Sequence, residues 1–160
     1  IGMGNIGREV ARLAEAFGCE VAYYSTSGIS RDEKYNKLEL NDLLSSSDIV
    51  SIHCPLNERT HNLIDTEELA MMKKSAILIN VARGGIVNEA ALAEALNSGN
   101  LRGAALDVFT SEPLRESPLY NLQDPYRLLA SPHTAWSSVE AIDRLIDCIA
   151  GNIQEYIAQK

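Results

Sequence analysis

Gly2-Met3-Gly4-Asn5-Ile6-Gly7 forms a G-x-G-x-x-G turn at the start of this 160-residue chain and opens directly into a helical pattern. In such a turn Gly2 allows the tight bend, Gly4 lets the backbone approach a phosphate, and Gly7 permits close packing of helix on strand. Free N–H groups and the positive end of the helix then face an anion. The turn therefore predicts a dinucleotide pyrophosphate site, provided that the flanking sequence supports it.

The residues on either side of the turn bear on this interpretation. Apolar side chains follow at a spacing that places them on one face of a helix, which Gly18 ends. They are Ile6, Val10, Leu13, Ala14 and Phe17. Only Ile1 stands where a buried strand should precede the turn. We therefore expect the chain to be truncated at its N-terminus.

The composition, with 46% hydrophobic and 22% charged residues, is that of one globular domain large enough to bury a core. A formal net charge of −8 disfavours a nucleic-acid partner. No apolar run reaches the roughly 18 residues that span a bilayer, and no signal-like segment leads the chain. We expect a cytoplasmic protein without membrane contact. Cys19, Cys54 and Cys148 lack metal-ligand spacing, so buried thiols are favoured over a disulfide framework or a metal site.

Short apolar stretches alternate with helical patterns along the rest of the chain. Strands are expected at residues 20–24, 48–52, 76–80, 103–107 and 127–130. Helices are expected at 40–44, 66–72 and 89–97, followed by a long terminal helix that runs from a capping-box pattern at Ser137 to Tyr156. This alternation indicates an α/β fold with a doubly wound, Rossmann-like parallel sheet, truncated at its first strand. Ligands of such folds gather at the carboxyl ends of the strands, and the irregular stretch 109–126 is long enough to be functional.

Three polar residues follow predicted strands, namely Arg83, Glu112 and His133. Histidine can carry a proton near neutral pH, a carboxylate can tune it, and arginine can bind a carboxylate or carbonyl through two hydrogen bonds. Hydride transfer to or from a hydroxy acid needs these parts. Taken singly, His133 could cap a loop, Glu112 could be a solvated carboxylate, and Arg83 could be a surface charge.

Five motifs, in this order along the chain, together resemble those of the D-isomer-specific 2-hydroxyacid dehydrogenases. They are the glycine turn and the stretches 47–56, 80–87, 105–113 and 131–136. The resemblance implies an NAD(P)-dependent oxidoreductase that interconverts a D-2-hydroxy acid and a 2-keto acid. It implies that His133 is the general acid/base, that Glu112 hydrogen-bonds it, and that Arg83 orients the substrate. A neighbouring carboxylate favours the imidazolium, so Glu112 would ready His133 to donate a proton.

The resemblance also implies which residues follow the cofactor, NAD or NADP. Besides Gly2, Gly4 and Gly7, these are Asn5 and Ile6 at the pyrophosphate, His53 and Pro55 along the adenosine half, Thr60, Val81 and Ala82 on the nicotinamide side, and Asp107 at the carboxamide. An aspartate at a strand end often caps the following turn instead. Both interpretations of Asp107 stay open at this point.

The sequence departs from the family pattern after Tyr24. NAD-dependent members end this strand with an acidic residue that binds the ribose hydroxyls, whereas Ser25-Thr26-Ser27-Gly28 stands here. Loss of the carboxylate removes repulsion against a 2′-phosphate, and three hydroxyls with Arg31 could bind one. Ser25 and Thr26 are therefore candidate cofactor contacts, and NADP stays open beside NAD.

Within the family, the stretches 117–119 and 132–137 are most similar to hydroxypyruvate reductases and glycerate dehydrogenases. Formate dehydrogenases carry glutamine where Glu112 stands and are disfavoured. A protein of another class, a cofactor-sensing interaction protein similar to the C-terminal-binding corepressors, remains an alternative. The resemblance further implies a homodimer, a small 2-keto or 2-hydroxy acid as ligand, and a substrate domain built before the glycine turn. Residues 1–160 would form the NAD(P)-binding domain, and the terminal helix, about 137–158, would contact that substrate domain.

Overall fold

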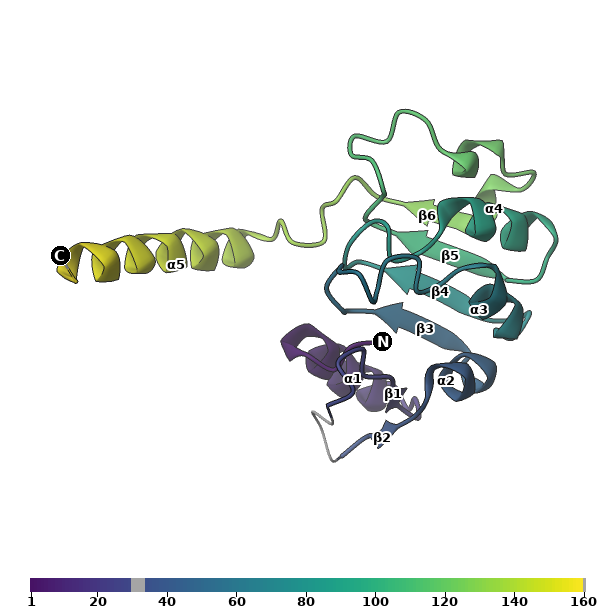
Figure 1. Cartoon of the computed structure of the whole chain (residues 1–160), viewed down its shortest axis with the longest axis horizontal. Coiled ribbons are helices and arrows are strands. Elements are labelled where there is room, and N and C mark those ends of the chain that lie inside the picture. The colour runs from purple at the N-terminus through teal and green to yellow at the C-terminus, as the bar shows by residue number, and fades with distance from the viewer. Residues whose placement is uncertain (30–33, 160) are drawn as a thin grey trace.

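The computed structural model describes residues 1–29 and 34–159, which form two parallel sheets (Figure 1). The larger sheet has the strand order β3 (Ile49–Ile52), β4 (Ile77–Asn80), β5 (Gly103–Leu106) and β6 (Leu128–Ala130). The smaller one pairs β1 (Ala22–Tyr23) with β2 (Asn36–Lys37). The predicted parallel α/β fold is confirmed. The sequence does not predict β2, because Asn-Lys carries no apolar pattern.

The register of the larger sheet brings the carboxyl ends of its strands together at one edge. Ile52 pairs with Asn80, Asn80 with Leu106, and Leu106 with Ala130. Ile52 and Leu78 are fully buried, as expected for parallel strands covered by helices. The loops that follow β3, β4, β5 and β6 therefore lie next to one another.

The first residues of the chain lie between the two sheets. The Ile1 nitrogen donates to the Ser51 carbonyl at 2.8 Å, and the His53 N–H donates to the Ile1 carbonyl at 2.8 Å. On the other side, the Gly2 N–H donates to the Tyr24 carbonyl at 2.9 Å. The glycine turn consequently begins between the ends of β1 and β3.

Helices α2 (Leu40–Ser46), α3 (Thr66–Met71) and α4 (Glu89–Asn97) contact one another in sequence and share the core beside the larger sheet. Their buried contributions include Leu44, Leu69 and Leu92. Side chains fix two of the starts: Asn88 accepts from the N–H groups of Ala90 and Ala91, and Asp65 forms a reciprocal capping box with Glu68. The elements near the site thus have defined ends.

Helix α1 (Asn5–Ala16) confirms the helix predicted after the glycine turn, but its large apolar side chains do not face the sheet. Gly7 and Ala11 are buried, whereas Ile6 and Phe17 are 67% and 88% exposed. A Cβ on Gly7 would lie 2.2 Å from the Gly2 carbonyl oxygen. Only small residues allow α1 to lie this close to the glycine turn. The packed face of α1 is therefore formed by small residues and not by the large apolar ones whose periodicity predicts the helix.

Helix α5 (Val139–Ala158) extends away from the sheets, at the yellow end of the chain in Figure 1. Ser138 caps it by accepting from the Ala141 N–H, so the capping box predicted from Ser137 is wrong: the cap lies one residue later. Among the described helices, none combines the length and apolarity needed to cross a membrane.

The described residues settle two further expectations, and a third falls outside them. Cys54 is buried, but Cys19 and Cys148 are exposed, so the expectation of buried thiols is wrong for those two. The stretch 109–126 is not wholly irregular, because it contains the short 3₁₀ helices η1 (Pro118–Asn121) and η2 (Pro125–Arg127), the second of which ends just beyond it. Arg31, expected beside a 2′-phosphate, lies outside the described residues.

Candidate active site

The glycine turn leaves room for an anion at the start of α1. Gly2 has a φ of 91°, and a Cβ there would lie 2.8 Å from the Cys54 nitrogen, so the turn is pressed against the end of β3. A Cβ on Gly4, in contrast, would meet no described atom within 4 Å. Gly4 is also the N-cap and offers no side chain to the first N–H groups of the helix. The open backbone and positive helix end suit a pyrophosphate.

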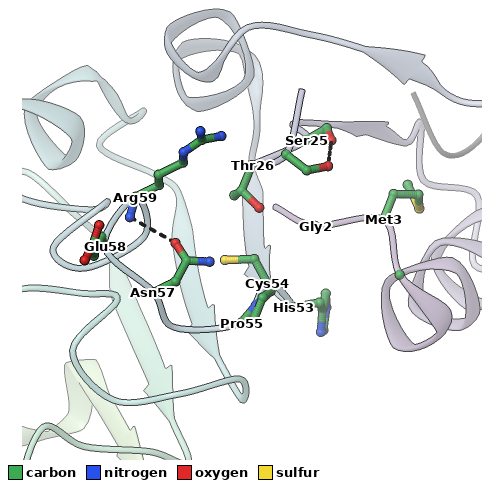
Figure 2. A pocket seen from close by; sticks show the side chains of 12 residues that line it. Gly2, Met3, Ser25, Thr26, His53, Cys54, Pro55, Asn57, Glu58 and Arg59 are labelled. Atoms are coloured by element: carbon green, nitrogen blue, oxygen red, sulfur yellow. Dashed lines mark hydrogen bonds between the residues drawn. The ribbon is translucent and has the colours of Figure 1, made fainter. Parts of the chain in front are cut away.

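Two adjoining hollows extend from this turn. The first, of about 730 Å³, lies between the glycine turn, the residues after β1 and the loop after β3 (Figure 2). The second, of about 500 Å³, continues toward the residues after β4. His53 and Pro55 line both. Predicted cofactor residues line one or both: Gly2, Gly4, Ser25, Thr26, Ile6, His53, Pro55, Val81 and Ala82.

The remaining predicted cofactor residues, Asn5, Gly7, Thr60 and Asp107, line neither hollow. Gly7 is buried under Gly2, and Asn5 Oδ1 accepts from Arg8. Thr60 is fully buried; its hydroxyl donates to the Pro55 carbonyl at 2.6 Å and accepts from the Asn57 N–H at 2.8 Å. Thr60 therefore shapes the loop that follows β3, and its contact with a cofactor stays a prediction.

His53 is a half-buried histidine at the junction of the two hollows. One of its ring nitrogens, Nε2, lies 2.9 Å from the Ser51 hydroxyl. Burial lowers the pKa of His53 to about 4. The ring is therefore neutral at pH 7 and presents a flat, uncharged face to the hollow.

Arg83 reaches the second hollow from the turn after β4. Its guanidinium donates to the Ala82 carbonyl at 2.6 Å and is otherwise exposed. The buried side chain of Asn80 holds this turn, donating to the Arg83 carbonyl at 2.9 Å and accepting from the Ala82 N–H at 3.1 Å. A Cβ on Gly84 would lie 1.8 Å from the Phe109 carbonyl oxygen. The arginine turn thus packs directly on the loop that carries Glu112.

Glu112 and His133 form the predicted pair. His133 Nδ1 lies 2.7 Å from Glu112 Oε2, and each side chain is 37% exposed. Glu112 Oε1 accepts from the Phe109 N–H at 3.0 Å. This backbone bond, and next the bond to His133, hold the pKa of Glu112 below its ordinary value. An ionised carboxylate only accepts, so Nδ1 donates and Nε2 is left for a substrate.

Asp107, which follows β5, fixes the loop that carries His133. It is 3% exposed, and its oxygens accept from the Ser131 hydroxyl at 2.6 Å and from the N–H groups of Thr134 and Ala135 at 2.8 Å each. Burial raises the pKa of Asp107, but these hydrogen bonds outweigh that effect and hold it below its ordinary value. His133 itself has a φ of 53°, in the left-handed region. Of its two interpretations, the loop-capping one describes the contacts that Asp107 makes; its contact with a carboxamide stays a prediction.

Glu89 is a site-supporting residue that sequence reasoning missed. From the first turn of α4 its carboxylate accepts from the Thr110 N–H and the Ser117 hydroxyl, both at 2.7 Å. These two contacts clamp both sides of the Glu112 loop. No local signal predicts them, because the partners lie 21 and 28 residues along the chain.

Comparison with known proteins shows the family to which this chain belongs. Residues 1–135 match the family described as "D-isomer specific 2-hydroxyacid dehydrogenase, NAD binding domain". A glycerate dehydrogenase of Methylorubrum extorquens is 39% identical over 160 residues, which are 100% of this chain and 49% of that protein. The chain therefore spans about half the length of the curated relatives it matches.

Solved structures agree with this assignment. A glyoxylate/hydroxypyruvate reductase of Sinorhizobium meliloti, described as NADPH-dependent and in complex with NADP and malonate, has a TM-score of 0.89 and 31% identity over 98% of this chain and 48% of that one. A D-lactate dehydrogenase of Aquifex aeolicus, complexed with NAD and lactic acid, has a TM-score of 0.89 and 28% identity over 99% of this chain and 52% of that one. Both nicotinamide cofactors thus occur among proteins with this fold.

Proposed function

Because the chain belongs to the D-isomer-specific 2-hydroxyacid dehydrogenase family, we propose that the protein is an oxidoreductase that interconverts a 2-keto acid and a D-2-hydroxy acid. The observation that carries the proposal is the 2.7 Å contact between His133 and Glu112, in the loops that follow β6 and β5. A cofactor-binding module alone needs no proton carrier. A histidine held by an ionised carboxylate is the arrangement that general acid/base catalysis requires.

The proton would pass through His133. Its Nε2 would protonate the keto oxygen during reduction and accept the proton back during oxidation. Glu112 keeps the ring orientation by accepting from Nδ1 and stabilises the charged imidazolium before transfer. A bound nicotinamide would supply the hydride to the keto carbon or accept it in the reverse direction.

Arg83 would hold the substrate. A guanidinium can donate two parallel hydrogen bonds to a carboxylate or to a carboxylate and neighbouring carbonyl, a geometry that lysine does not reproduce. Asn80 fixes the turn beneath Arg83, so that the guanidinium is presented from a rigid strand end. The packing of Gly84 on Phe109 then ties the position of Arg83 to that of Glu112.

Hydroxypyruvate and D-glycerate are the substrates that we propose, because relatives are named glycerate dehydrogenase and glyoxylate/hydroxypyruvate reductase. Relatives whose complexes are solved bind small organic acids such as malonate and lactic acid. The exposed apolar face of α5, with Leu145, Ile149 and Ile153, supports a contact between this helix and a substrate domain. We also propose a cytoplasmic homodimer, which the family resemblance supports. The alternative of a cofactor-sensing interaction protein is not favoured, since the relatives carry the names of enzymes.

Turnover by the intact protein tests this function. Oxidation of NADPH and of NADH would be followed separately with hydroxypyruvate, glyoxylate and pyruvate as acceptors. We expect turnover with hydroxypyruvate that His133→Ala reduces by about 100-fold or more, while His61→Ala, which removes an exposed histidine, leaves it unchanged. Equal rates for wild type and His133→Ala would contradict the proposal, as would cofactor binding without any turnover.

A further inference from the structure

The first hollow has a corner that hydroxyl and charged side chains line. Two segments far apart in sequence form it: the Ser25–Ser27 turn that follows β1, and Asn57, Glu58 and Arg59 in the loop after β3. Figure 2 shows the Arg59 side chain reaching toward Thr26, while the Glu58 carboxylate points to the other side. The corner is therefore polar on one wall and cationic on the other.

The three hydroxyl groups of the Ser25–Ser27 turn make different contacts. Ser25 is 7% exposed; its hydroxyl donates to the Ile29 carbonyl at 2.7 Å and lies 3.3 Å from the Ser27 hydroxyl. Ser25 lines the hollow, but its hydroxyl is used within the turn. In the described part of the chain, the Thr26 hydroxyl has no hydrogen-bond partner, and Ser27 is exposed. Thr26 and Ser27 are the side chains that remain to donate to a ligand.

Two positive side chains lie near this turn, and neither forms an ion pair with a carboxylate of the described residues. Among the described residues the Arg59 guanidinium makes no ion pair, and its backbone N–H is held by Asn57 Oδ1 at 2.9 Å. Lys37, on β2, donates to the Gly28 carbonyl at 2.6 Å, which places a second cation at the far end of the turn. A ribose with free hydroxyls needs no such cation, whereas a phosphate dianion does.

We infer that this corner binds the 2′-phosphate of NADP, with the Arg59 guanidinium as its counter-charge and the Thr26 and Ser27 hydroxyls as further donors. The inference rests on the proposed function and on a cofactor bound with its pyrophosphate at Gly4 and its adenosine ribose beside the residues after β1. Family membership leaves the cofactor open, because relatives of this fold are solved with NADP and with NAD. Arg59 therefore determines cofactor specificity, from a loop that does not belong to the ribose-binding strand.

Binding of nucleotide fragments tests the inference without relying on turnover. Isothermal titration calorimetry on the intact protein would compare 2′,5′-ADP with 5′-AMP, and NADP⁺ with NAD⁺. We expect wild type to bind each 2′-phosphorylated nucleotide more tightly than its partner. Arg59→Ala should weaken 2′,5′-ADP and NADP⁺ by about tenfold and change 5′-AMP and NAD⁺ by less than about twofold. Arg59→Glu should have a larger effect of the same kind, since it adds repulsion.

The control is Arg102→Ala, which removes the same charge at an exposed position before β5, remote from the hollow, and should change none of the four affinities. Equal weakening of phosphorylated and unphosphorylated nucleotides by Arg59→Ala would overturn the inference, as would unchanged affinities. Those results leave the proposed function intact if hydroxypyruvate is still reduced. Wild type that binds none of the four nucleotides would instead contradict the proposed function and the inference with it.

Discussion

Replacing Asp107 by asparagine separates its two possible roles, fixing the His133 loop and contacting the cofactor. Asp107 Oδ1 accepts from the Ser131 hydroxyl and the Thr134 N–H, and Oδ2 accepts from the Ala135 N–H. Asparagine keeps one acceptor oxygen, which can serve the first two donors. The Ala135 N–H would then face an NH₂ group. We expect Asp107→Asn to destabilise the protein and slow turnover, with cofactor affinity unchanged.

The magnitude follows from the contacts. A partly buried N–H left without an acceptor costs about 1–3 kcal/mol, and the two remaining bonds lose the strength that a charged acceptor adds. We expect the free energy of unfolding to fall by about 2–3 kcal/mol at pH 7. Because residues 131–135 carry His133, a loosened loop misplaces the imidazole, and kcat should fall by about tenfold or more.

Urea unfolding followed by circular dichroism would measure the loss, with Asp147→Asn on the exposed face of α5 as the control for removal of a charge. The pKa of Asp107 is lowered from its ordinary 3.8, so its contribution is complete above that pH and is lost as the pH falls through the lowered value. The difference between wild type and variant should shrink in the same window. Unchanged stability with a tenfold weaker cofactor would refute the reasoning and favour a carboxamide contact.

Two further predictions concern the Glu112 loop. Glu89→Ala removes the acceptor of the Thr110 N–H and the Ser117 hydroxyl, so we expect a kcat about tenfold lower and a smaller change in the KM for substrate. Steady-state kinetics would check this, with Glu94→Ala on the same helix as the control. Equal effects of the two variants would contradict the prediction. The pKa of Glu112 is lowered from 4.5, so the stability it contributes is present above that pH and lost as the pH falls through the lowered value. Glu112→Gln should therefore flatten the acid limb of the unfolding curve, and an unaltered limb would show that the bonds of this carboxylate to Phe109 and His133 add nothing to stability.

The sequence predicts the framework well where local chemistry decides it. Helix α4 matches its expected bounds because Asn88 is a strong N-cap and Gly99, with a φ of 73°, follows its end. Strands β3 to β6 are confirmed, each one residue shorter than predicted, because buried parallel strands are apolar runs in the sequence. The packed face of α1 could not be predicted, because close approach of the helix at Gly7 selects small side chains over the larger ones that dominate the periodicity.

The candidate site likewise has residues that the sequence predicts and contacts that it does not. Arg83, Glu112 and His133 stand out because each follows a strand within a recognisable motif. The contacts that hold these residues cannot be predicted from the sequence, because the partners are far apart along the chain. Asp107 and Ser131 are separated by 24 residues, and Glu89 and Ser117 by 28. Likewise Ser25 reads as a ligand residue, yet its hydroxyl is used within the turn, and Arg59 becomes relevant only when two loops meet.

These distant contacts explain how a partly exposed pair can keep a fixed geometry. At 37% exposure, the attraction between Glu112 and His133 is worth about 1 kcal/mol or less, which does not by itself hold two loop side chains in place. Asp107 anchors the His133 loop from a buried position, and Glu89 clamps the Glu112 loop at two points. The geometry of the pair is thus imposed by residues that would not touch the substrate. The pair can then stay open to a small acid and still present Nε2 in a constant orientation.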